Sequence, residues 1–266
     1  GCDRLPGDTE MRYLIQSYSA LLILSLLPLP AMATEARSGY HYLKPDTRVL
    51  QDDEFANPGL MVVENGEVLF NKQYKSSGKS CVDCHGVSGE KLSPRSLARY
   101  PVVDEDSKEI ISLQTQLGRC RSRVTAETLP VNHAELLELE TFVRHLAHGQ
   151  KVNVNTSGAV KPLLEQGEKL YKQRYGLIDM SCDSCHNTYA GFMVRGQKIS
   201  QGQGNGFPAY RLDIGEMTNL NMRVTQCLNL MRAEPFPADS QEIKLLELYM
   251  MSRSNGLPIE TPAVRY

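Results

Sequence analysis

The sequence predicts an all-α protein in which two similar domains are joined by a linker, with irregular loops between the helices. Residues 66–70 (GEVLF) lie 15 positions before Cys81, and residues 167–171 (GEKLY) lie 15 positions before Cys182. The two segments repeat at an offset of 101 positions, which indicates an internal duplication. Apolar residues recur at helical spacing in each half, and no stretch alternates strongly enough to predict a sheet.

Each half carries two cysteines separated by two residues and followed directly by histidine. The copies are residues 81–85 (CVDCH) and 182–186 (CDSCH). In this pattern two thiols add to the vinyl groups of a haem, and the adjacent imidazole binds the iron. A zinc half-site or a redox dithiol would not explain a histidine in the same place twice. The motifs therefore predict two cytochrome c-like domains with two covalently bound haems c. Cys81, Cys84, Cys182 and Cys185 would form the thioethers, and His85 and His186 would bind the irons.

The start of the chain has the features of a secretory signal. A basic region begins at Met11, residues 20–29 are mostly apolar, and small residues precede a cleavage point after Ala33. The apolar run is shorter than the roughly 20 residues that a membrane span needs. We expect residues 1–10 to be upstream sequence, residues 1–33 to be absent from the mature chain, and that chain to be periplasmic without a membrane span.

The composition is that of a soluble globular protein. The chain is 41% hydrophobic and 23% charged, and its net charge of -2 argues against a nucleic-acid partner. The polar segment 150–159 is expected to act as the linker. We therefore predict an N-terminal domain at 34–150 and a C-terminal domain, which contains the active site, at 151–266.

The helix that closes each half is also repeated. Asn132 and Asp239 are expected to cap these two helices. Beyond the caps the halves match at an offset of 107 positions, as Glu140 matches Glu247. An aromatic residue on each closing helix is expected to face the glycine of the first helix, as in the close helix crossing of cytochrome c domains.

The second axial ligand of each iron follows from what each half offers. No methionine lies between Met61 and Met180, and no histidine follows His186. If both halves use the same ligand type, only Cys120 and Cys227 are available at matching positions. A disulfide between them is the alternative, since the expected compartment is oxidising. The repeat favours thiolate ligation of both irons.

Arg223 lies four residues before Cys227, which is one helical turn if that segment is helical. A guanidinium there would hold the sulfur as its anion and attract an anionic substrate. The alternative is a solvated surface arginine. Arg119 and Arg121 flank Cys120 in a similar way, but without a glycine-rich segment before them.

Several segments of the chain resemble the SoxA family. They are residues 204–212 (GNGFPAYRL), 223–227 (RVTQC), 232–235 (RAEP) and 256–262 (GLPIETP). The resemblance extends from about Tyr40 to the end of the chain, and the two haem motifs are typical of the dihaem form. SoxA is the dihaem subunit of the SoxAX cytochrome of periplasmic thiosulfate oxidation.

The resemblance implies an enzyme, an L-cysteine S-thiosulfotransferase. Such an enzyme couples thiosulfate oxidatively to a cysteine of the SoxYZ carrier, and two electrons leave through haem to the monohaem subunit SoxX, with which it forms a heterodimer. Cys227 would be the active-site ligand, as a thiolate or persulfide, and Arg223 the active-site arginine. Cys120 and His85 would bind the iron of an auxiliary N-terminal haem.

Two other functions fit the same motifs. In a plain dihaem electron carrier, Cys227 would be a ligand only, and Arg223 would have no role. A dihaem thiosulfate dehydrogenase would instead couple two thiosulfates to tetrathionate. An assay with thiosulfate alone separates these possibilities, because only the dehydrogenase makes a product without a carrier protein.

Overall fold

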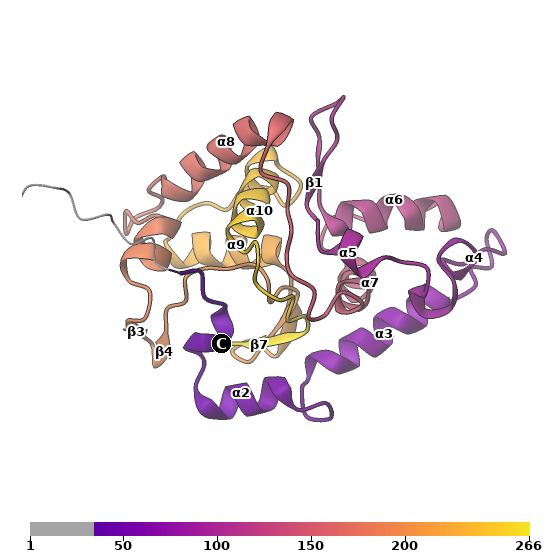
Figure 1. Ribbon diagram of the computed structural model, residues 1–266, viewed down its shortest axis with the longest axis horizontal. Coiled ribbons are helices and arrows are strands. Elements are labelled where there is room, and N and C mark those ends of the chain that lie inside the picture. The colour runs from indigo at the N-terminus through magenta and orange to yellow at the C-terminus, as the bar shows by residue number, and fades with distance from the viewer. Residues whose placement is uncertain (1–34) are drawn as a thin grey trace, which may run out of the picture. The chain divides into compact units, whose positions relative to one another are not determined.

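Helices dominate the described part of the chain, residues 35–266 of a computed structural model (Figure 1). The α-helices are α2 (Pro45–Asp52), α3 (Gly59–Asn71), α4 (Val82–His85), α5 (Pro94–Leu97), α6 (Leu113–Thr125), α7 (Ala134–His145), α8 (Lys161–Lys172), α9 (Leu220–Leu230) and α10 (Gln241–Arg253). Shorter helical turns are η2 (Gly39–Tyr42), η3 (Val87–Gly89), η4 (Gly158–Val160) and the π-helical turn η5 (Ser184–Thr188). The predicted signal sequence at 1–33 lies outside the described residues.

The strands are two or three residues long and form three small sheets. The antiparallel pairs are β1 (Val102–Val103) with β2 (Ile110–Ile111), β3 (Met193–Val194) with β4 (Gln197–Lys198), and β5 (Ala209–Arg211) with β6 (Glu216–Thr218). The last strand, β7 (Ala263–Arg265), pairs in parallel with β5. Strands this short show no alternation of polar and apolar residues in the sequence, so they were not predicted. The all-α class is confirmed.

The internal repeat is visible in the packing of the helices. In one half α3 packs on α7, and in the other α8 packs on α10. Helices α6 and α9, which precede the closing helices, also correspond, and the β1–β2 and β5–β6 pairs lie at equivalent positions. Figure 1 shows α3, α6 and α7 together in one half, and α8, α9 and α10 together in the other.

Each helix pair crosses at a glycine, as the sequence predicts. A Cβ atom on Gly66 would lie 2.1 Å from the Glu138 carbonyl oxygen, and one on Gly167 would lie 2.5 Å from that of Leu245. Real Cβ atoms do not approach so closely. The backbones of the crossing helices are therefore in contact, and only glycine leaves room for them.

An aromatic pair packs beside each crossing. The rings of Phe70 and Phe142 have centroids 5.4 Å apart, and those of Tyr171 and Tyr249 have centroids 5.3 Å apart. Both separations are typical of favourable aromatic contacts. The predicted pairing of the first and last helix of each half is thus confirmed on both sides of the repeat.

The closing helices begin one residue later than predicted. His133 caps α7 and Ser240 caps α10, in place of Asn132 and Asp239. Asn132 has a positive φ of 65°, so it cannot take the extended conformation of a capping residue. Its side-chain oxygen instead accepts a hydrogen bond of 3.0 Å from Asn219, in the other half. A contact between the halves therefore replaces the cap.

The predicted linker, residues 150–159, packs against the rest of the chain and does not stand apart from it as a free connection. Val152 and Val154 are 2% and 3% exposed. The Val152 backbone donates to the Leu257 carbonyl and accepts from the Gly256 amide, both at 2.9 Å. Residues 36–266 form one compact unit. The two halves therefore share one continuous core, and the boundary between 150 and 151 stays a prediction.

The segment before α3 packs against the end of the chain. Helix α2 contacts β7, and the Asn57 amide donates to the Pro262 carbonyl at 2.9 Å. Ser38 also bonds to the carboxylate of Glu260. The first and last described segments are therefore neighbours, as Figure 1 shows for α2 and β7.

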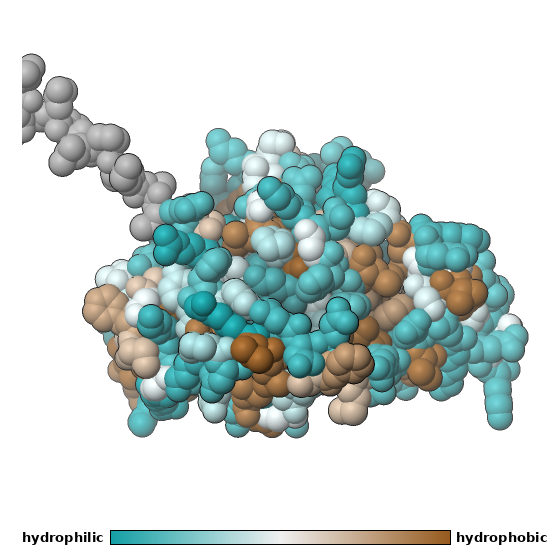
Figure 2. All heavy atoms as spheres, turned by 60° about the horizontal axis from the view of Figure 1, so that its bottom comes forward, coloured by the Kyte–Doolittle hydropathy of each residue, from teal (hydrophilic) through white to brown (hydrophobic). Residues whose placement is uncertain are grey.

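The surface is mixed in character. Figure 2 shows a face on which polar side chains predominate, with apolar side chains in separate groups between them. Large apolar side chains with more than half of their surface exposed include Phe55, Leu177 and Phe192. Among the described residues, no helix is both long enough and apolar enough to cross a membrane.

We predict that alanine at either crossing glycine destabilises the fold. Gly66→Ala and Gly167→Ala should each lower the free energy of unfolding by about 1–3 kcal/mol, because the added methyl group overpacks the crossing. Gly118→Ala in α6 is the matched control, since its Cβ would meet only Leu136, at 3.8 Å. Thermal unfolding followed by circular dichroism measures the difference. Equal stability of the Gly66 and Gly118 variants would contradict the prediction.

Candidate active site

The N-terminal motif opens onto a large apolar cavity. Cys81 and His85 line this cavity together with Cys120 of α6, and its volume is about 150 Å³. Its other lining residues are mostly apolar: Phe70, Leu92, Leu97, Tyr100, Leu113, Gln116, Leu117, Arg121, Leu139 and Val143. Cys84 is exposed. The structure therefore brings the predicted histidine and distal cysteine to one cavity.

Neither arginine beside Cys120 is free to hold an anion there. Arg119 forms a salt bridge of 2.5 Å with Glu109. Arg121 is buried and paired with Glu135 at 2.8 Å. The polar contact to the Cys120 sulfur comes instead from Gln116, whose amide donates at 3.4 Å. The environment of this thiol is therefore close to neutral.

In the C-terminal half, η5 and the loop after it orient His186. The Nδ1 atom lies 2.8 Å from the carbonyl oxygen of Ser200 and donates a hydrogen bond to it, which fixes the orientation of the ring. Gly202 packs on the ring, because a Cβ there would lie 2.7 Å from Cγ of His186. A histidine whose Nδ1 atom is held in this way can bind a metal through Nε2.

Cys227 lies on α9, opposite this histidine. Helix α9 begins at its cap residue Asn219, which brings Cys227 to the third turn. Its half-buried sulfur forms a hydrogen bond with His186. Burial alone would raise the pKa of the Cys227 thiol, but the charge of Arg223, the contact with His186 and the charge of Arg211 lower that pKa to about 7. The site therefore favours a sulfur anion.

Two guanidinium groups approach the Cys227 sulfur. Arg223 lies one turn earlier on α9, as predicted, and donates to the side chain of Gln226 at 3.2 Å. Arg211 of β5 is buried, and Asp213 accepts from it twice, both at 3.2 Å. One carboxylate thus faces two guanidinium groups, so the site carries an excess of positive charge beside the sulfur.

Sequence reasoning did not assign a role to Arg211. It lies 16 residues before Cys227, so no helical spacing connects the two. Only the β5–β6 hairpin, which folds back before α9, brings its side chain to the sulfur. Burial and the like charge of Arg223 lower the pKa of Arg211. An arginine in the segment 204–212 was the only available signal.

The alternative of a disulfide is wrong for the described residues. Cys120 and Cys227 are both free, as are the four motif cysteines. The motif cysteines Cys182 and Cys185 lie near enough to Cys227 for its charge to act on them. Burial, followed by that charge, raises the pKa of the Cys182 thiol to about 12. The predicted C-terminal site residues are therefore brought together.

Comparisons with known proteins agree with this arrangement. The family described as "SoxA/TsdA, cytochrome c domain" matches residues 65–152 and 166–259. The L-cysteine S-thiosulfotransferase subunit SoxA of Pseudaminobacter salicylatoxidans is 36% identical over 233 residues, which are 87% of this chain and 81% of that relative. The chain belongs to the SoxA family. The SoxA of Paracoccus pantotrophus is 36% identical over 86% of this chain and 79% of its own length.

A solved structure supports the family assignment. The crystal structure of SoxXA from P. pantotrophus matches with a TM-score of 0.80 and 35% identity, covering 87% of each chain. Since the family is defined by a cytochrome c domain, the chain binds haem c. Two features of its own residues fit that group. The N-terminal cavity is large and apolar, and in each half a histidine and a distal cysteine converge.

We predict that Gly202 positions the His186 ring. Gly202→Ala should displace the ring and change the visible and electron paramagnetic resonance spectra of a haem bound by His186, while thioether bonds to Cys182 and Cys185 would remain intact. Gly196→Ala is the matched control, because both glycines have positive φ, 69° and 78°, but nothing lies within 4 Å of a Cβ at Gly196. Both variants carry the same kind of backbone strain, about 1–2 kcal/mol. Identical spectral changes in the two would rule out the positioning role.

Proposed function

We propose that the chain is a dihaem L-cysteine S-thiosulfotransferase subunit that acts in the periplasm. It would carry one haem on Cys81 and Cys84 and a second on Cys182 and Cys185. His85 with Cys120, and His186 with Cys227, would bind the two irons. The observation that supports this function most directly is the excess positive charge around Cys227. Arg211 is paired with the carboxylate of Asp213, whereas Arg223 donates to the uncharged side chain of Gln226.

The substrate class follows from that charge. Thiosulfate is a small dianion, and its sulfonate oxygens suit the planar guanidinium groups of Arg223 and Arg211. Binding there would direct its other sulfur towards Cys227. The segment 202–206 is buried, and its glycines pack closely against neighbouring side chains, so a carrier thiol would reach the sulfur from another side.

The reaction joins thiosulfate to a cysteine of a SoxYZ-type carrier. A sulfur–sulfur bond forms between the outer sulfur of thiosulfate and the carrier cysteine, the thiol proton is lost, and two electrons are released. When bound, haem c supplies the acceptor for these electrons. Arg223 and Arg211 orient the substrate, and their charge favours the anionic form of the sulfurs that react.

The two halves are expected to differ in activity. In the repeat, Gln116 stands where Arg223 does, and Asp104 stands where Arg211 does. Gln116 offers Cys120 a hydrogen bond without charge. An anionic substrate would therefore be attracted to the C-terminal site only, and the N-terminal haem would be auxiliary. The crystallised relative is a SoxXA complex, and we expect a SoxX-type monohaem subunit as partner and electron acceptor.

One assay tests the function directly. The purified holoprotein with its SoxX-type partner is incubated with thiosulfate, with and without a SoxYZ-type carrier, and the products are analysed by mass spectrometry. A thiosulfonate adduct on the carrier cysteine supports the proposal. Tetrathionate from thiosulfate alone would indicate a thiosulfate dehydrogenase instead. Intact mass of the chain counts the haems and reveals any additional sulfur on Cys227.

We predict that the two distal cysteines are not equivalent. Cys120→Ala should change the spectrum of the N-terminal haem and leave substantial turnover. Cys227→Ala should abolish turnover, while the thioethers of both haems remain. Electron paramagnetic resonance should show low-spin His/Cys signals from both haems in the wild type and the loss of one in each variant. Equal loss of turnover in the two variants would argue against a single active centre.

We predict a graded loss of turnover at Arg223. Arg223→Lys keeps the charge but not the two-pronged contact, and Arg223→Gln reproduces the arrangement found at Cys120. Loss of a charge-assisted contact typically costs roughly 1.5–3 kcal/mol, so kcat/KM of the Gln variant should fall about ten- to a hundredfold or more. The Lys variant should lie between it and the wild type.

Arg119→Gln is the control for Arg223, because it removes an arginine beside the other distal cysteine. Its partner Glu109 lies at the surface, so this change should leave turnover near the wild-type value. The haem content of all these variants should be unchanged. Near wild-type rates for both Arg223 variants would show that this arginine is an ordinary surface residue.

A further inference from the structure

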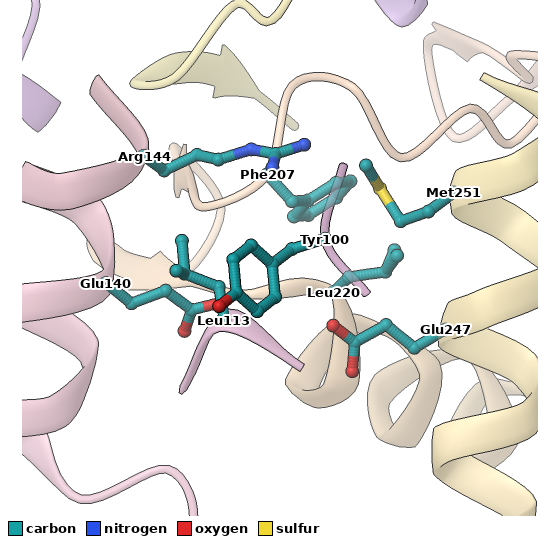
Figure 3. A pocket seen from close by; sticks show the side chains of 8 residues that line it. All are labelled: Tyr100, Leu113, Glu140, Arg144, Phe207, Leu220, Glu247 and Met251. Atoms are coloured by element: carbon teal, nitrogen blue, oxygen red, sulfur yellow. The ribbon is translucent and has the colours of Figure 1, made fainter. Parts of the chain in front are cut away.

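A second and much smaller cavity, of about 20 Å³, which is room for about one water molecule, lies where the two halves meet (Figure 3). Its eight lining residues are Tyr100, Leu113, Glu140, Arg144, Phe207, Leu220, Glu247 and Met251. Figure 3 shows Glu140 and Arg144 extending from one helix, and Glu247 and Met251 extending from another on the opposite side. The helices are α7 and α10. No residue proposed to act on thiosulfate lines this cavity.

The lining consists of four pairs related by the internal repeat. At the offset of 107 positions Tyr100 corresponds to Phe207, Leu113 to Leu220, Glu140 to Glu247, and Arg144 to Met251. The cavity therefore lies on the axis that relates the two halves. The charge symmetry is broken at one pair, because methionine replaces the second arginine. Two carboxylates thus face a single guanidinium group.

The carboxylate of Glu140 is buried and partly satisfied. One of its oxygens accepts hydrogen bonds from the Gln114 amide at 2.8 Å and from the Asn219 amide at 3.1 Å. Burial raises the pKa of Glu140 to about 7, although these hydrogen bonds oppose the shift. Burial and the charge of Glu140 raise the pKa of Glu247 to about 8. Two such carboxylates titrate as a pair.

The guanidinium of Arg144 has an unused donor. Its Nη1 atom donates to the Leu97 carbonyl at 2.8 Å, whereas Nη2 has no hydrogen-bond partner among the described residues. Arg144 is only 4% exposed and lines the cavity. Leaving a buried charged donor without a partner costs free energy, so a polar group bound in the cavity would be stabilising. Water between Nη2 and the carboxylates meets this need.

We propose that Glu140, Glu247 and Arg144 form a buried proton-binding site, which takes up one proton from solvent when an electron enters the adjacent N-terminal haem pocket. If both carboxylates were ionised, the cluster would hold one uncompensated negative charge. Burial makes such a charge unfavourable, so the pair binds a proton more strongly than a solvated carboxylate does. Glu247 keeps part of its surface exposed, which allows exchange with solvent.

The link to the haem pocket follows from shared walls. Tyr100 and Leu113 line both this cavity and the N-terminal cavity, and Leu97, which binds Arg144, lines the latter. Only these shared side chains separate the two cavities. An electron added to a haem in the N-terminal cavity therefore makes the surroundings of the carboxylates more negative and raises their affinity for a proton. Only an O–H bond forms, with a solvent proton. The electron is supplied by a one-electron reductant, such as the mediator of a redox titration, and the proposal rests on the haem assignment above.

Few other groups face the carboxylates. Arg144 comes from α7 and Gln114 from α6, Asn219 lies at the start of α9, and Tyr100 lies before β1. Of these only Arg144 and Tyr100 titrate, and burial, followed by the charge of Cys120, raises the pKa of the Tyr100 phenol. Arg144 stays charged near neutral pH, with its pKa lowered by burial to about 10. The carboxylate pair is therefore the group that changes charge.

The test is a redox titration of the holoprotein between about pH 6 and pH 9, a range that contains the raised carboxylate pKa values. The potential of the N-terminal haem should fall as pH rises, because reduction is accompanied by proton uptake. The slope approaches about 59 mV per tenfold change in proton concentration where one proton accompanies one electron. Infrared difference spectra recorded on reduction should show a protonated carboxyl band appearing.

Glu247→Gln removes one carboxylate and should flatten the slope and abolish the infrared band. Glu140→Gln serves as the second variant if the first fails to fold. Glu165→Gln, an exposed carboxylate on α8, is the control and should retain both signals. A potential independent of pH in the wild type, or an unchanged slope in Glu247→Gln, would overturn the proposal. Intact mass is measured first, because a missing haem would refute the haem assignment and not the proton site.

Discussion

Direct backbone contact between α3 and α7, and between α8 and α10, determines where the functional residues lie. Because Gly66 and Gly167 have no side chain, each closing helix lies against the first helix of its half. In the N-terminal half, one face of α7 then lines the apolar cavity beside Cys81 and His85 through Leu139 and Val143. The next positions along the same helix, Glu140 and Arg144, face the other half. One close crossing thus positions both the wall of this cavity and the contact between the two halves.

Duplication followed by divergence explains why the two halves share a fold but differ in the charge beside the distal cysteine. The fold retains the positions of the motif, the distal cysteine and the closing helix on both sides. The charge beside the distal cysteine differs, since Gln116 corresponds to Arg223. At the cavity between the halves it is the C-terminal half that lacks the positive charge, because Met251 corresponds to Arg144. Single substitutions at equivalent positions can therefore give one pocket an anion site and leave an unbalanced charge elsewhere.

The sequence predicted features that depend on local spacing or on the repeat. Helix α9 sets Arg223 one turn from Cys227, and the repeat identified both glycine crossings. Contacts between distant segments were not accessible in this way. Arg211 reaches the sulfur only because a hairpin folds back, and Asn132 gives up a helix cap for a contact with Asn219. In both cases tertiary packing decides the position of the residue, and a single sequence gives no signal of contacts between such distant segments.

The packing of the first described segment on the last one has a consequence for the order of folding. Its hydrogen bonds, such as those from Ser38 to Glu260 and from Asn57 to Pro262, join residues 222 and 205 positions apart. Closing so long a loop costs more entropy than forming the helix pairs within each half. In a chain that emerges from its N-terminus, residues 36–58 lack their contacts with β7 and the residues before it until the end of the chain has been made. The contact between the first and last described segments is therefore expected to form after the helix pairs of the duplicated core, once both segments are present.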